Sequence, residues 1–117
     1  EKKIMSVKLT ILKTGETLIS DMQEVVSNEN QETPQAYILN NPHLVKIREK
    51  QFLTEEEKND KKVGIDVLLT PWIMISSDRK IIIPVDVVTT IVEPIEGVKK
   101  MFLDKNELLE SGEKLNG

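Results

Sequence analysis

The sequence predicts an all-β protein, a small and strongly bent five-stranded antiparallel open barrel with an enlarged hairpin tip and a short C-terminal helix. Apolar and polar residues alternate with a period of two over most of the chain, which is typical of half-buried strands. The connections are short and polar, and 117 residues suffice for one modest core. We therefore expect a single domain over residues 1–117, with its core at about residues 5–94 and an extension over residues 95–117.

The first two strands follow from this alternation. Val7, Leu9 and Ile11 are expected to face one side of the first strand, which stops before Gly15. The second strand is expected over about residues 17–26.

The third strand is expected over residues 36–48, after a polar loop at residues 27–35. It is interrupted at Asn41-Pro42. Because proline has no N–H to donate to a ladder, Pro42 predicts a bulge, an edge or a bend.

A charged segment over residues 49–62 separates this strand from the next. Five acids and four bases lie there with only two apolar residues, so we interpret it as a solvated hairpin tip. Residues 63–69 alternate again as a strand returning from the tip, and Pro71-Trp72 bends that strand.

The last strands are predicted from short apolar runs. Residues 73–76 and 81–83 flank a polar turn at residues 77–80 that suits a hairpin. Residues 84–86 form a short corner, and residues 87–92 alternate as the final strand.

A short helix is expected to end the fold. Asp104 and Glu107 have the spacing of a capping box, and Leu108 and Leu109 give a small apolar face.

Residues 73–92 carry apolar side chains on both strand faces, so something must cover the second face. The sheet curling on itself, the C-terminal segment and another copy of the chain remain as alternatives.

The residues needed for catalysis are missing from the sequence. There is no cysteine, and His43 is the single histidine, without a G-x-S-x-G turn to present a serine. Asp66 and Asp86 are best explained as an outward strand residue and a corner residue. The isolated glycines form no phosphate-binding loop, and no set of ligands has metal-binding spacing. We expect no enzyme activity, no catalytic residue, no cofactor and no metal.

The charge pattern gives a mixed indication about partners. The net charge is -4, yet the first thirteen residues hold four lysines against one glutamate, and Arg79-Lys80 and Lys99-Lys100 are further basic pairs. In a single subunit these are best explained as outward-facing charges, whereas a ring would repeat each patch around its axis.

The longest apolar stretch, residues 81–92, is too short to span a bilayer. Without a charged-then-apolar leader, we expect a cytoplasmic protein and no membrane partner.

Three segments carry a resemblance to a known family. They are residues 12–21, LKTGETLISD, residues 37–42, YILNNP, and residues 81–94, IIIPVDVVTTIVEP. They resemble the two signatures of the Sm-like family, which includes the LSm and Hfq-type proteins. The chain is similar in particular to the small Sm-like proteins encoded by tailed cyanophages.

The resemblance implies a homo-oligomeric ring of about five to seven subunits, in which the fourth strand pairs with the fifth strand of the next subunit. The interface residues are then Ile81, Ile82, Ile83, Val88, Thr89, Thr90, Ile91 and Val92. It also implies single-stranded RNA binding at the pore, through the loop at residues 27–35 and the corner at residues 84–86. The candidate RNA-binding residues are Asn28, Asn30, Gln31, Arg79 and Lys80.

The chain departs from the family pattern at its RNA site. Val25 stands where Sm proteins usually carry an asparagine, and Pro84-Val85 replaces the usual Arg-Gly. The fold can therefore carry over, but the RNA site does not carry over residue by residue.

Two hypotheses of function follow from this. The first is a ring that binds single-stranded RNA, as an RNA chaperone in the host cytoplasm if the chain is phage-encoded. The second is a structural or protein-interaction ring that binds no nucleic acid.

Overall fold

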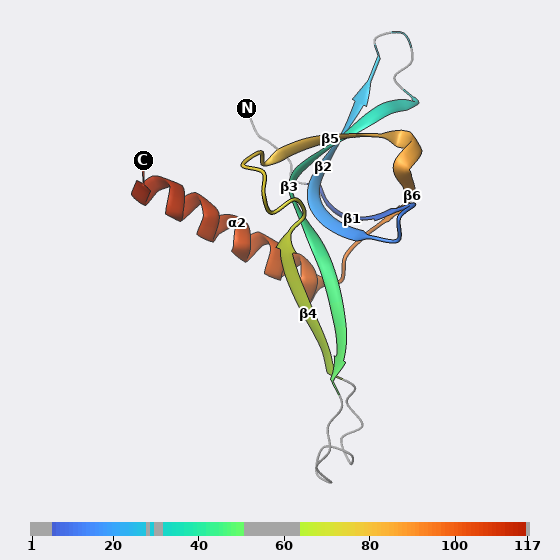
Figure 1. Ribbon diagram of the computed structural model, residues 1–117. Helices are drawn as coiled ribbons and strands as arrows, with labels where there is room; N and C mark the ends of the chain where they lie inside the picture. The colour runs from blue at the N-terminus through green and yellow to red at the C-terminus, as the bar shows by residue number, and fades with distance from the viewer. Residues whose placement is uncertain (1–5, 28, 30–31, 51–63, 117) are drawn as a thin grey trace.

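The computed structural model describes residues 6–27, 29, 32–50 and 64–116. Within these residues, six strands are followed by one α-helix, with a 3-10 helix before the last strand (Figure 1). The elements are β1 (Val7–Leu12), β2 (Thr17–Val26), β3 (Pro34–Lys50), β4 (Gly64–Pro71), β5 (Lys80–Pro84), η1 (Val85–Val87), β6 (Val88–Val92) and α2 (Glu96–Asn116).

The strands form one antiparallel sheet that curls but stays open. Its order is β4-β3-β2-β1-β6, and β5 pairs with β3 beside β4. Figure 1 shows the sheet curling so that β5, η1 and β6 close over β1 and β2. The prediction of a mostly β protein, with an open antiparallel sheet and a C-terminal helix, is therefore confirmed.

Five strands were expected and six are found, because two short strands share the partner strand β3. β5 pairs with residues 36–40 of β3, and β4 pairs with residues 43–50. The change of partner falls at Asn41, which has a positive φ of 55°, and at Pro42. There the Trp72 N–H donates to the Pro42 carbonyl at 3.0 Å, and the Asn41 N–H donates to the Arg79 carbonyl at 2.6 Å. The predicted bend at Asn41-Pro42 is confirmed.

The predicted hairpin around residues 77–80 is wrong. Residues 72–79 form a loop that leaves the edge of β3 after β4 and returns to it at β5. Residues 73–76 are a turn, closed by the Ser76 N–H donating to the Ile73 carbonyl at 3.1 Å. They are not a strand because their apolar side chains are exposed and meet no neighbouring strand.

Each face of the sheet carries a buried apolar cluster, and a different part of the chain packs over each cluster. Leu18 and Ile19, adjacent on β2, are both 0% exposed and belong to two separate apolar clusters. The first cluster fills the inside of the curl, and its buried members are Leu12, Leu18, Met22, Tyr37, Leu39 and Ile83. The second lies between the sheet and α2, and its buried members are Val7, Ile19, Leu69, Val98 and Phe102. Within one chain, the curl and the C-terminal segment thus each cover one face.

The C-terminal helix is longer than predicted and begins earlier. It starts at Glu96, where the Ile95 carbonyl accepts the N–H groups of Val98 and Lys99 at 3.1 and 3.0 Å. Asp104 therefore lies inside the helix and does not cap it. The start is set by packing, since Val98 and Phe102, one turn apart, are both buried against the sheet.

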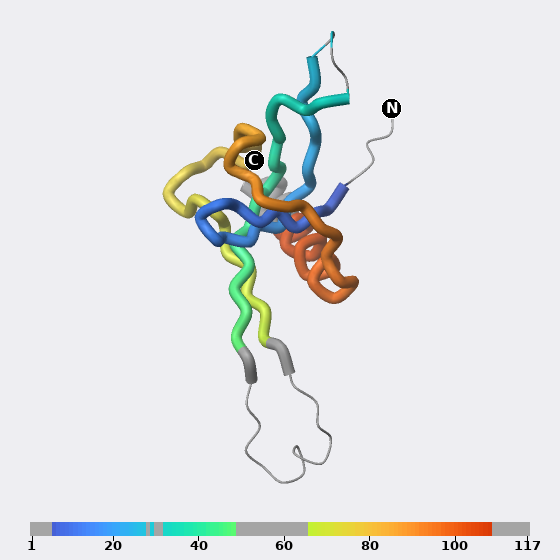
Figure 2. Tube along the Cα trace, turned by 90° about the vertical axis from the view of Figure 1, so that its right-hand side faces the viewer, coloured from blue at the N-terminus to red at the C-terminus, as the bar shows by residue number. Residues whose placement is uncertain are grey.

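The β3–β4 hairpin projects away from the curled sheet (Figure 2). The predicted tip at residues 49–62 lies almost entirely outside the described residues. Only its first two residues are described, at the end of β3.

Candidate functional site

Free strand edges are the first candidate functional feature. Among the described strands, β4 and β5 pair only with β3, and β6 pairs only with β1, so each of these three strands leaves one side unpaired. An unpaired edge presents a row of backbone donors and acceptors that can pair with another chain. The β5 and β6 edges lie toward opposite ends of the sheet order, so one copy carries both halves of a potential contact.

The predicted interface residues divide according to exposure. Ile82 is 63% exposed and Val92 43% exposed, and Thr89 and Thr90 are also exposed. The side chain of Ile83 is only 5% exposed and packs inside the curl, so it is not available to a partner. The remaining three, Ile81, Val88 and Ile91, are half-buried against the same cluster.

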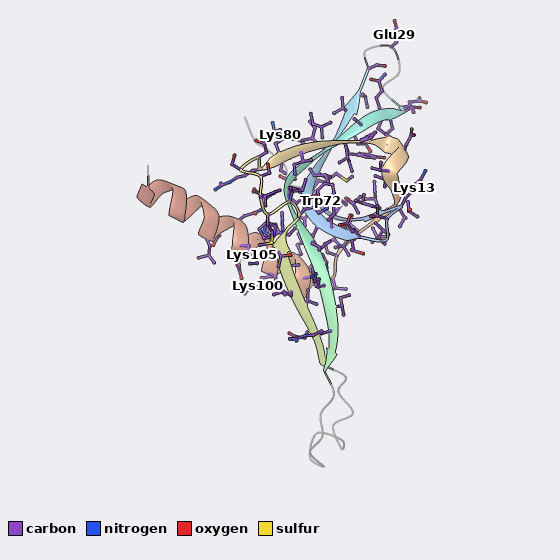
Figure 3. All side chains as sticks on the ribbon, viewed as in Figure 1. Lys13, Glu29, Trp72, Lys80, Lys100 and Lys105 are labelled. Atoms are coloured by element: carbon purple, nitrogen blue, oxygen red, sulfur yellow. The ribbon has the colours of Figure 1, made fainter. Side chains whose placement is uncertain are left out.

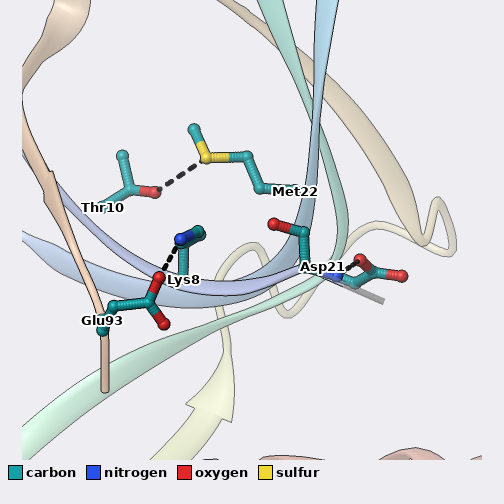
Figure 4. A network of polar contacts seen from close by, with 6 residues as sticks. Lys8, Thr10, Asp21, Met22 and Glu93 are labelled. Atoms are coloured by element: carbon teal, nitrogen blue, oxygen red, sulfur yellow. Dashed lines mark hydrogen bonds and ion pairs between the residues drawn. The ribbon is translucent and has the colours of Figure 1, made fainter. Parts of the chain in front are cut away.

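An ion pair fixes the end of β6 to β1. The Lys8 ammonium contacts the Glu93 carboxylate, as Figure 4 shows. The hydrogen bond from Lys8, together with its charge, lowers the pKa of Glu93. Lys8 is therefore engaged within its own chain, which weakens the basic patch expected at the N-terminus. Lys2 and Lys3 of that patch lie outside the described residues.

Polar contacts also hold the strands that lead to these edges. The Thr10 hydroxyl donates to the Met22 sulfur at 3.8 Å inside the curl. The Ser6 N–H donates to the Asp21 carboxylate at 2.9 Å, and the Asn40 amide donates to the Asp21 carbonyl at 3.0 Å (Figure 4 shows the first two contacts).

A cavity of about 500 Å³ beneath the loop at residues 72–79 is the second candidate feature. The loop, the Asn41-Pro42 bend of β3 and helix α2 enclose it. Its apolar lining is Pro42, Pro71, Trp72, Ile73, Met74, Ile81 and Leu108. Its charged and titratable lining is His43, Asp78, Arg79 and Lys105.

Exposed apolar side chains surround this cavity. Ile73 is 41% exposed and Met74 74%, and Leu108 on α2 is 71% exposed; all three line the cavity. Ile75, in the same loop, is 99% exposed and does not line it. Apolar residues grouped in this way mark surfaces that bind other molecules. This surface was not predicted from the sequence, because residues 73–76 were expected to form a strand. Three consecutive apolar residues after Pro71-Trp72, with no alternation, were the available signal.

His43 lies in the wall of the cavity as a neutral group. It is 4% exposed, its Nδ1–H donates to the Asn41 carbonyl at 2.8 Å, and its ring meets Phe102 edge-on at 5.9 Å. Burial lowers the pKa of His43, the bond to Asn41 raises it, and the Lys105 charge lowers it.

Of the candidate RNA-binding residues, the structure describes only Arg79 and Lys80. Asn28, Asn30 and Gln31 lie outside the described residues, in the loop that precedes β3. Residue 84, at the end of β5, pairs with Ala36 near that loop, whereas Lys80, at the start of β5, pairs with Asn40. Arg79 and Lys80 therefore lie at the far end of β5 from that loop. Figure 3 shows the same separation between Lys80 and Glu29, a described residue of the loop.

No group of three or more histidine, aspartate or glutamate residues that could hold a metal ion occurs among the described residues. No helix among them is long and apolar enough to cross a membrane.

The fold and these features define a helix-covered, open and strongly curled β-sheet with unpaired edges at β4, β5 and β6. By its sequence, the chain belongs to the family of unknown function DUF6561, whose family model matches residues 5–107. That match covers the whole sheet and the first half of α2. No curated protein matches the chain.

Proposed function

We propose that this protein is a non-enzymatic Sm-like subunit that assembles into a ring by pairing its β5 edge with the β6 edge of the next copy. The observation that carries the proposal is the pair of free edges on one open sheet. Because the two edges differ, their pairing is head to tail, and such contacts close into rings when the rotation between copies allows. The exposed side chains of Ile82 and Val92 would be covered in that contact.

Light scattering at several protein concentrations tests this proposal. We expect a stable multimer of about five to seven chains. A single chain of 13.3 kDa at all concentrations would contradict it.

Binding of single-stranded RNA is the first activity we propose for the ring. The supporting observation is that η1 and the loop before β3 lie at the same end of the β3–β5 pair, next to both free edges. In a ring, each polar loop would be repeated around the axis. Fluorescence polarisation with short U-rich and A-rich RNAs at low salt tests this RNA binding. The absence of binding by the assembled ring would contradict the proposed activity.

A protein-interaction ring is the second candidate, and the apolar loop at residues 72–79 favours it. The net charge of -4 also disfavours general binding to phosphates. Affinity capture that recovers nucleic acid and no protein would count against this candidate. With either activity, the resemblance to cyanophage proteins leads us to propose the host cytoplasm as the place of action.

A further inference from the structure

The cavity beneath the loop at residues 72–79 lies next to the start of β5, one of the two proposed assembly edges. We infer that it receives residues 93–96 of the neighbouring copy, which are the link between β6 and α2 together with the first residue of α2, with the partner subunit's Ile95 seated against Trp72. The inference rests on the proposed ring and adds a second contact to it. The site is incomplete in one chain, because the residue that fills it comes from the next.

The lengths of the two edges place the link at the cavity. β5 and β6 are both five residues long. Antiparallel pairing in full register sets Lys80 beside the partner subunit's Val92. The partner chain then continues alongside residues 76–79, which form the outer wall of the cavity.

The link carries an apolar side chain that its own chain leaves uncovered. Ile95 is 71% exposed, although it lies between the edge strand β6 and the packed start of α2. The cavity lining next to β5 is apolar and includes Trp72, Met74 and Ile81. Seating Ile95 there would remove two exposed apolar surfaces from water at once.

The charges of the two surfaces are complementary. Arg79 and Lys105 line the cavity and Lys80 lies beside it, against one acid, Asp78. Within the described part of the chain, Lys105 makes no ion pair. The link contributes two exposed acids, Glu93 and Glu96.

Glu93 can serve both copies. Its side chain is 72% exposed while it contacts Lys8, so a second cation can reach it. Opposite charges at a rim fix the register of an interface more than they add affinity. The acids of the link therefore favour the full register over a slipped one.

Paired cysteines test the inference separately from the ring, because the natural chain has no cysteine. The double variant Ile82→Cys/Thr90→Cys reports edge pairing, and Ser77→Cys/Ile95→Cys reports the link at the cavity. The control Ser77→Cys/Gln23→Cys places its second thiol on the central strand β2. Each variant is treated with a short bismaleimide and analysed on a denaturing gel.

We expect chains linked into dimers and larger species for the first two variants and not for the control. Cross-linking through the edges but not through the cavity would overturn this inference and leave the ring intact. A protein that stays a monomer, with no cross-linking in either pair, would overturn both proposals.

Trp72 supplies a second measurement, because it is the single tryptophan. Its emission should shift to the blue on assembly of the natural chain. The shift should be lost in Ile95→Ser and kept in Leu68→Ser, a change at an exposed site on β4 away from the cavity. A blue shift that survives Ile95→Ser would contradict the seating of Ile95 against Trp72.

Discussion

His43 shows at the level of one residue how burial alters a titratable group. The buried ring is held between Phe102 and the Asn41 carbonyl. Burial, the largest effect, favours the neutral ring and lowers its pKa in the folded protein below the ordinary value of 6.5.

His43 should therefore make the protein less stable in mild acid. The unfolded chain binds the proton more readily, so the stabilising contribution is complete above pH 6.5 and is lost as the pH falls through the folded pKa. Urea unfolding between pH 5 and 7.5 should show this loss. The His43→Phe variant should remove the part of the pH dependence that lies below pH 6.5 and arises from this histidine. An NMR titration of the single histidine that gave a pKa above 6.5 would contradict the prediction.

Gly15 and Gly97 should respond in opposite directions to alanine. Gly15 has a φ of +95°, a backbone conformation that alanine rarely adopts. Gly97 lies in the first turn of α2, and a Cβ added there meets nothing within 4 Å. We expect Gly15→Ala to lower the free energy of unfolding by about 1 kcal/mol or more, and Gly97→Ala to raise it by about 0.4–1 kcal/mol. Denaturant titration of both variants measures the two changes in the free energy of unfolding. Equal changes would contradict the backbone conformations described for Gly15 and Gly97.

Helix α2 acts as one element by covering the outer face of the sheet. Val98 and Phe102 are buried in the same cluster as Val7, Ile19 and Leu69 from three strands. The first half of the helix is thus part of the core. In Figure 1 its second half extends beyond the sheet.

Phe102→Ala should be among the most damaging substitutions in α2. The side chain is 0% exposed, so its removal leaves a cavity, and we expect the free energy of unfolding to fall by about 3–5 kcal/mol. The matched control on the same helix is Leu108→Ala, where the side chain is 71% exposed. It should change stability by about 0.5 kcal/mol or less. A similar loss in both variants would mean that the helix does not pack as described.

The loop at residues 72–79 is the element that most changes the surface of the molecule. It exists because β4 and β5 leave and rejoin the same edge of β3 on either side of the Asn41-Pro42 bend. A continuous strand would have paired with the whole of β3 and enclosed no cavity. The irregular backbone at Asn41 and the cavity thus share one cause.

At the level of the whole molecule, the open sheet determines how copies would assemble. A lysine on an edge strand opposes pairing, because its charge would have to lose water within the interface. We expect Thr90→Lys, on the β6 edge, to reduce the proposed multimer to a single chain of 13.3 kDa.

The control for this change is Gln23→Lys, which adds the same charge at an exposed site on β2 that pairs with Ile38 of β3 and lies on neither of the two proposed assembly edges. Light scattering should give the same mass for this control as for the natural chain. Circular dichroism should show that both variants keep the β-fold. An unchanged mass for Thr90→Lys would show that the β6 edge does not take part in the interface.

The fold class and most strand positions could be predicted from the sequence, because period-two alternation is a local signal. Alternation gave β1, β2 and β6, the missing N–H of Pro42 indicated the irregularity in β3, and the break in the pattern at residues 84–86 indicated the corner now seen as η1. The free edges, which carry the proposed ring, were also expected, although from a resemblance and not from alternation.

The tertiary structure alone decided which apolar runs pair and which stay exposed. The run at residues 73–76 and the start of α2 were both misassigned, since each depends on contacts with residues distant in sequence. Local alternation reports that a side chain is suited to burial, whereas burial itself requires a partner surface. For Phe102 that surface is the sheet, and for Ile73 to Ile75 the described part of the chain provides none.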